Sequence, residues 1–116
     1  MTVYFIQEPS PKRTPPDITT AHAYGQVKFV FDYKFPVSQK PETAYAHAEE
    51  VLKDFDPRED FIADCGGDKM ALGVVTHILA DWEIIKFLRW NRYDGGSYEP
   101  TYIGRVDGGS RVSVNR

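Results

Sequence analysis

A chain of 116 residues with 41% hydrophobic and 14% aromatic residues is long enough for one globular domain, predicted to span residues 1–116, and too short for two. Its formal charge of −3 argues against general nucleic-acid binding, which requires a basic face. No apolar run reaches the ~18 residues that cross a bilayer, and the single cysteine, Cys65, suits a reducing compartment. A cytoplasmic protein without a membrane partner is therefore expected.

The first half of the chain predicts two strands and two helices. Residues 3–6 are β-branched or aromatic and predict a strand, while residues 7–16 hold four prolines and predict an arm or loop. Residues 17–25 are compatible with a short helix. Residues 27–35 alternate apolar and mostly charged side chains, which predicts a strand with one buried face. Apolar residues at helical spacing over 44–55 predict an amphipathic helix.

The second half predicts a helix between strands and then a hairpin. A short strand that begins at Phe61 runs through two glycines into a helix whose apolar stripe extends to Trp82. Residues 84–90 predict the next strand, and residues 98–103 predict an edge strand that pairs with it through the glycine-containing turn before it. Residues 104–116 indicate a loose C-terminal tail or a weak final strand.

Two consecutive strand–helix–strand units form the centre of this pattern. Such units nearly always cross over right-handedly and give parallel strands. The predicted fold class is therefore α/β, with a small mixed sheet of about five strands, a parallel βαβαβ centre and two main helices, similar to half of a Rossmann fold. The first strand and the final hairpin are expected to flank this centre.

The turn between the central strand and the second helix is a candidate anion or nucleotide site. Backbone amides at a helix start and the positive end of the helix dipole attract phosphate. Gly66 and Gly67 would let a phosphate approach the backbone, Lys69 would neutralise it, and Asp68 completes the turn. The alternative is structural: Asp68 caps the helix, and the glycines permit the tight turn.

The Gly66-Gly67-Asp68 sequence is similar to the phosphate-binding turn of the NAD kinase, diacylglycerol kinase and phosphofructokinase families. That resemblance implies a nucleotide- or phosphate-binding domain. Those families continue with a further glycine and a hydroxyl residue, where this chain has Lys69 and Met70.

Cys65 lies between the central strand and the second helix, a position where a thiol can be activated. This placement resembles the loop of cysteine phosphatases, but the arginine that ends their loop is replaced by Ala71. An inert core thiol is the favoured interpretation. The three histidines have no spacing typical of a metal motif, so no catalytic residue, metal or cofactor is predicted, and an enzyme is not favoured.

Basic and aromatic residues gather after the second helix and form the candidate partner-binding surface. These residues are Arg89, Trp90, Arg92, Tyr93 and Tyr98. Tryptophan, tyrosine and arginine dominate protein–protein hot spots. The same types can stack on single-stranded nucleic acid, and a plain core strand with solvent-exposed arginines is the third interpretation.

The chain as a whole resembles the short phage-encoded α/β proteins of unassigned function. The features that carry this resemblance are the Gly66-Gly67-Asp68 turn, the Leu88-Arg89-Trp90 strand and the Tyr98-Glu99-Pro100 strand. It implies a phage accessory or host-interaction protein. The sequence therefore predicts a non-enzymatic protein-binding module whose partner is another protein or a second copy of itself.

Overall fold

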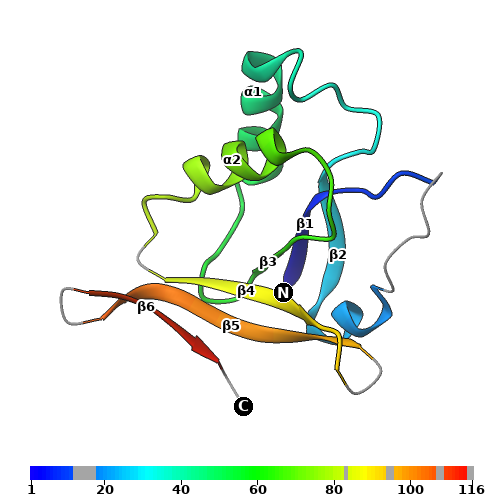
Figure 1. Cartoon of the computed structure of the whole chain (residues 1–116). Coiled ribbons are helices and arrows are strands. Elements are labelled where there is room, and N and C mark those ends of the chain that lie inside the picture. Colours follow the sequence, from blue (N-terminus) through cyan, green and yellow to red (C-terminus); the bar gives the residue numbers. More distant parts are fainter. Residues whose placement is uncertain (12–17, 83, 94–95, 107–108, 115–116) are drawn as a thin grey trace.

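The computed structural model describes residues 1–11, 18–82, 84–93, 96–106 and 109–114, and in 104–106 and 109–114 it describes the backbone alone. One six-stranded sheet in the order β2-β1-β3-β4-β5-β6 organises these residues (Figure 1). The elements in chain order are β1 (Thr2–Gln7), the 3-10 helix η1 (Thr19–Tyr24), β2 (Gln26–Phe31), α1 (Pro41–Val51), β3 (Phe61–Ala63), α2 (Lys69–Ile78), β4 (Ile84–Asn91), β5 (Ser97–Val106) and β6 (Gly109–Val114).

The sheet has a parallel half and an antiparallel half. Strands β2, β1, β3 and β4 are parallel neighbours, whereas β4, β5 and β6 pair antiparallel. The predicted α/β class with a mixed sheet is confirmed, and so is the parallel pairing of β3 with β4, in which Ile62 lies opposite Phe87. The predicted hairpin is confirmed as β4–β5, with Trp90 opposite Tyr98.

The prediction that the first strand flanks the parallel centre is wrong. Strand β1 lies between β2 and β3, so the β2–α1–β3 connection passes over it. Val3 and Phe5 have no exposed surface, and Ile6 has 1%. An uninterrupted apolar run is typical of a parallel strand that is covered on both faces. The composition of residues 3–6 therefore matches a central position.

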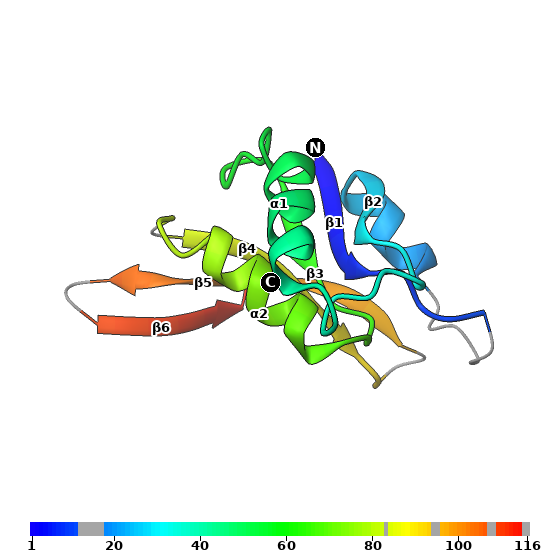
Figure 2. The same cartoon turned by 90° about the horizontal axis from the view of Figure 1, so that it is seen from above.

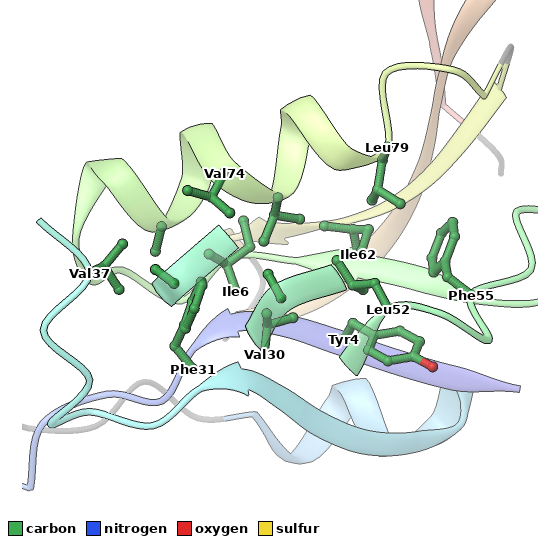
Figure 3. Packing of buried hydrophobic residues seen from close by; sticks show 14 residues of the cluster. Tyr4, Ile6, Val30, Phe31, Val37, Leu52, Phe55, Ile62, Val74 and Leu79 are labelled. Atoms are coloured by element: carbon green, nitrogen blue, oxygen red, sulfur yellow. The ribbon is translucent and has the colours of Figure 1, made fainter. Parts of the chain in front are cut away.

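Helices cover both faces of the parallel half. Helices α1 and α2 lie together on one face, and η1 lies on the other (Figures 1 and 2). The connection from β1 to β2 and the connections from β2 to β3 and from β3 to β4 run in opposite directions along the sheet. Right-handed crossovers therefore place the connecting helices on opposite faces, η1 on one and α1 and α2 on the other. The larger core lies under α1 and α2, where Ile6, Val30 and Ile62 meet Leu52 and Val74 (Figure 3).

Both main helices are shorter than the apolar periodicity predicts. Helix α1 begins at Pro41, where a first turn tolerates the missing donor, and ends at Val51. Leu52 and Phe55 remain buried although they follow the helix. Helix α2 ends at Ile78, so Trp82 belongs to the next loop and is 48% exposed instead of lying in the apolar stripe.

Two further strand predictions need correction. Strand β2 ends at Phe31; Gln26 and Lys28 are exposed, as one buried face predicts, but the end of the strand is covered on both faces, because Val30 packs under the helices while Phe29 packs on the η1 side. Strand β5 is not an edge strand, since β6 pairs with it. Of residues 104–116, residues 104–106 complete β5 and residues 109–114 form β6, which agrees with a final strand; residues 107–108 and 115–116 lie outside the described residues. Of the predicted arm at 7–16, Gln7 belongs to β1, and residues 12–16 lie outside the described residues.

Candidate functional site

The turn after β3 holds the four residues predicted to bind an anion. Gly66 and Gly67 have φ angles of 103° and 113°, a conformation that favours glycine. Asp68 is the N-cap of α2, and its Oδ1 accepts a hydrogen bond of 2.8 Å from the Met70 amide. Lys69, the first residue of α2, is exposed. The structural role predicted for the glycines and Asp68 is confirmed.

The side chain of Gln7 closes this turn from the end of β1. Gln7 Oε1 accepts a hydrogen bond of 2.7 Å from the Asp68 amide, and Gln7 Nε2 donates to the Asp32 carbonyl at 3.2 Å. A Cβ atom at Gly67 would lie 2.6 Å from Gln7 Oε1. Gln7 is 5% exposed, so one side chain joins the carboxyl ends of β1 and β2 to the β3–α2 turn.

Three amides of the turn that the sequence suggested for anion binding are already hydrogen-bonded, and carboxylates lie beside them. The Gly66 amide donates to Asp64 Oδ1 at 3.0 Å, in addition to the Asp68 and Met70 amides already engaged. Hydrogen bonds from Ser38 and from the Met70 amide lower the pKa of Asp68, which stays ionised at neutral pH. Two negative side chains at a turn with engaged amides oppose phosphate binding.

Cys65 is a half-buried thiol whose Sγ donates a hydrogen bond of 3.3 Å to the Gln7 carbonyl. Burial, and then the charge of Asp64, raises the pKa of Cys65 to about 11. A nucleophilic cysteine needs a lowered pKa. The geometry agrees with the inert thiol that the sequence favoured.

The predicted partner-binding residues lie at the far end of β4. We use the name Trp90 surface for Trp90, Arg92 and Tyr93, which are exposed, Trp90 by 38% and Tyr93 by 75%. Arg89 is exposed as well, but neighbouring residues of a strand face opposite sides, so it does not share the face of Trp90. Tyr98 is different: it is 3% exposed and packs in the core below the surface, its ring 5.5 Å from that of Phe5.

Trp90 is held in place by its neighbours. Its ring meets the Tyr98 ring edge-on at 5.0 Å, and a Cβ atom at Gly96 would lie 2.5 Å from Trp90 Cζ2. Gly96 has φ 85°, so its conformation and its lack of a side chain both accommodate the indole. The Tyr98 amide is fixed in turn by the Thr20 hydroxyl at 2.9 Å.

The alternating basic and aromatic residues of β4 do not form one continuous platform. Phe87 packs on the helix side of the sheet, whereas Leu88 packs on the η1 side. Arg89 projects from the helix side and pairs with Glu99 at 3.4 Å, while Trp90 projects from the η1 side beside Tyr98. Lys86 turns away toward the Arg58 carbonyl and lies 5.3 Å from the centre of the Phe61 ring.

A groove that the sequence did not indicate lies at the opposite edge of the sheet, where β3 and β4 begin. This amino-edge groove has a volume of about 1000 Å³ and is lined by residues 53–58, Asp81, Trp82, Ile84, Lys86 and Tyr102. Its lining residues belong to the loop after α1, the loop after α2, the start of β4 and the strand β5. Trp82 and Ile84 are each 48% exposed in this groove.

Trp82 was the available signal for the groove. Its spacing from Ile78 and Leu79 matched a helical stripe, so the periodicity assigned it to the core. The capping of α2 at Leu79 places Trp82 beyond the helix, and the Trp82 amide donates to the Leu79 carbonyl at 3.2 Å in the following turn. A tryptophan at this spacing can lie in the core, if the helix continues to it, or at the surface, if the helix ends before it. The position of the helix end decides between the two.

Two further findings concern metals and membranes. Over the residues that the structure describes, no group of three or more histidine, cysteine, aspartate and glutamate side chains is arranged to hold a metal ion. No helix within the described ranges combines the length and the apolar character needed to cross a membrane.

Comparison with known families finds a match over most of the chain. The model of a family described as phage Pam3 gp32-like protein matches residues 1–104. Neither the comparison with curated proteins nor the comparison with solved structures finds a significant match.

Proposed function

Because the chain belongs to the phage Pam3 gp32-like family, we propose that it is a non-enzymatic phage accessory protein that binds another protein through the Trp90 surface. The resemblance to short phage-encoded α/β proteins is confirmed by the family match, and a phage accessory role is consistent with it. The observation that carries the binding proposal is the fixed, exposed indole of Trp90.

The fixed position of Trp90 favours binding for an energetic reason. Ordering a flexible side chain at an interface costs roughly 0.5–1.5 kcal/mol, and a side chain that is already held avoids much of this cost. Trp90 rests against Tyr98 and Gly96 and keeps more than a third of its surface exposed. Arg92 and Tyr93 follow it directly and are exposed. Tryptophan, tyrosine and arginine side chains that are exposed close together are typical of the centre of a protein interface.

The two alternatives from the sequence have less support. At Gly66–Lys69 a phosphate would find the Gly66, Asp68 and Met70 amides already hydrogen-bonded and would approach two carboxylates. Single-stranded nucleic acid would meet Arg89 and Trp90 on opposite faces of β4. Both remain predictions, and a thermal-shift screen with nucleotides and a salt-dependent oligonucleotide titration test them.

The proposal is tested by capture of a partner on immobilised protein, identification by mass spectrometry and repetition with the purified partner. We expect Trp90→Ala and Arg92→Ala each to weaken binding at least tenfold while the circular dichroism spectrum stays unchanged. Tyr33→Ala is the matched control, because Tyr33 is 39% exposed and lies outside the Trp90 surface.

One kind of result would contradict binding through the Trp90 surface, and another would change the identity of the partner. Binding that survives in both variants, or that is lost equally in Tyr33→Ala, would contradict it. Self-association that Trp90→Ala abolishes would identify a second copy of the chain as the partner.

A further inference from the structure

We infer that the amino-edge groove binds a short peptide segment in which lysine or arginine alternates with apolar residues, its cations meeting Asp54 and Asp81 and an apolar side chain covering Trp82 and Ile84. This site lies at the opposite end of β4 from the Trp90 surface, so the inference does not depend on the proposed function.

The size of the groove fits an extended peptide. Its volume of about 1000 Å³ is at the upper end of the range for ligand pockets, roughly 300–1,000 Å³. Its walls come from two separate loops and from β4 and β5, through Ile84 and Tyr102. Phe55 supplies a buried aromatic wall, and Trp82 and Ile84 leave about half of their surfaces open to solvent. Burial of such surface on binding contributes roughly 25 cal/mol per Å².

The basic side chains of the groove already have partners within the chain. Lys53 pairs with Glu50 at 2.6 Å, and Arg58 pairs with Asp56 at 3.4 Å. Lys86 donates to the Arg58 carbonyl and lies over the Phe61 ring. These cations are therefore engaged before any ligand arrives.

Two carboxylates of the groove, those of Asp54 and Asp81, have no such partners among the described residues. Across the part of the chain that the structure describes, neither Asp54 nor Asp81 has an ion pair or a hydrogen-bond partner for its side chain. Burial raises the pKa of the Tyr4 phenol most, and the negative charges of Asp60 and then Asp54 raise it further. With Lys53 paired to Glu50 and Arg58 to Asp56, the remaining charges of the lining, over the residues that the structure describes, are Asp54, Asp81 and Lys86, whose partners are a neutral carbonyl and a ring. The two carboxylates outnumber this one cation, so the groove keeps an excess of one negative charge.

The helix ends add to this negative potential. Helix α1 is capped at Leu52 and α2 at Leu79, so both carboxyl-terminal ends point their carbonyl groups toward the loops that line the groove. A helix C-terminus carries about half a negative charge and favours nearby cations. Lysine and arginine also bind aromatic faces, and Trp82 provides the strongest such face in proteins.

Selection from a randomised heptapeptide library on the immobilised wild-type protein identifies the ligand class. We expect the enriched peptides to contain lysine or arginine next to leucine, isoleucine or aromatic residues. Synthetic copies are then titrated into Trp90→Phe, in which Trp82 is the sole tryptophan because the chain has two. Saturable change in the fluorescence of Trp82 would locate the peptide in the groove.

Charge-removing variants test the role of the carboxylates. The double variant Asp54→Asn/Asp81→Asn is expected to weaken peptide binding at least tenfold, and so is 0.5 M salt relative to 0.05 M. Glu42→Gln is the matched control, since it removes a carboxylate at the other end of α1 and should leave the affinity unchanged.

Several outcomes would overturn the inference. These are failure to enrich any peptide, enrichment of acidic peptides, an unchanged affinity in the double variant, or binding that leaves Trp82 fluorescence unaffected. A concentration-dependent dimer that the double variant dissociates would assign the groove to a second copy of the chain instead.

Discussion

The parallel strands end at a carboxyl edge and begin at an amino edge, and at each of these edges one buried polar side chain connects neighbouring segments. The space at the carboxyl edge is filled, whereas the amino edge has an open groove. At the carboxyl edge, Gln7 connects the ends of β1 and β2 with the β3–α2 turn and occupies the space beside Gly67. At the amino edge, Asp60 accepts hydrogen bonds of 2.9 Å from the Thr2 and Asp56 amides. Asp60 fixes the loop before β3 without filling the groove that this loop lines.

This difference shows that the position where α/β folds usually bind a ligand can instead be occupied by side chains that stabilise the fold. Ligands of open α/β sheets normally bind at the carboxyl ends of the strands, where the strand order reverses. In this sheet that reversal lies between β1 and β3, and Gln7 and the Asp68 turn occupy it. The open, ligand-sized groove lies at the other edge.

The largest expected effect tests how much the amino edge depends on Asp60. Asp60→Ala removes the acceptor of two amide hydrogen bonds, and leaving buried donors unpaired should lower the free energy of unfolding by about 3 kcal/mol. Urea denaturation measures the change. Asp60→Asn, which keeps one acceptor oxygen, is expected to lose less, and equal losses in the two variants would contradict this role.

A smaller effect tests the contact that closes the carboxyl edge. Gly67→Ala combines a positive φ with a Cβ atom 2.6 Å from Gln7 Oε1, and we expect it to lower the free energy of unfolding by about 2 kcal/mol. Gly66→Ala has a similar φ but no atom within 4 Å of its Cβ, so about 1 kcal/mol is expected. If both variants were equally stable, the approach of Gln7 would contribute nothing.

The cap of α2 gives a pH-dependent test at the same edge. Asp68→Ala should lower the free energy of unfolding by about 1 kcal/mol at pH 7. Because the pKa of Asp68 is lower in the folded protein than in the unfolded chain, its contribution is complete above pH ~4 and is lost as the pH falls through the folded-state pKa. The difference between wild type and Asp68→Ala in urea denaturation should therefore shrink toward pH 3.

Ser38 provides the control for this pH dependence. Its hydroxyl donates to Asp68 Oδ2 at 2.6 Å and is the largest cause of the lowered pKa. In Ser38→Ala the contribution of Asp68 should begin to fall at a higher pH. An unchanged profile would show that the backbone hydrogen bonds to Asp68, which Ser38→Ala retains, are enough to lower its pKa.

The smallest expected effect concerns the open edge. Asp54→Asn/Asp81→Asn removes two exposed carboxylates without partners in the described residues, so the free energy of unfolding should change by less than about 0.5 kcal/mol. Thermal and urea denaturation check this. A loss above about 1 kcal/mol would mean that these side chains stabilise the fold and are not reserved for a ligand.

Features that depend on neighbouring residues in the chain were predictable from the sequence. The glycine turn, the cap by Asp68 and the β4–β5 hairpin each follow from the local preferences of a few consecutive residues. The exposure of Arg89, Trp90, Arg92 and Tyr93 also agrees with the sequence, whereas Tyr98 is buried and supports Trp90 from the core. Their role in binding a partner stays a prediction.

Features that depend on distant residues were not predictable in the same way. The closure of the turn requires that Gln7 lie beside Gly67, which follows only when β1 is known to pair with β3. The groove requires that α2 end at Ile78, a shift of a few residues that transfers Trp82 from the core to the surface. Helix boundaries and the choice of strand partners are not determined by periodicity.

The central position of β1 has a consequence for the order in which the protein folds. Its partners are distant in the chain, since Val3 lies opposite Val27 on one side and Phe61 on the other. The β4–β5 hairpin closes between Asn91 and Ser97 and can form within about 1–10 μs. Closure of the parallel half must wait for a long loop to bring Phe61 to Val3, so we expect docking of β3 to limit the folding rate.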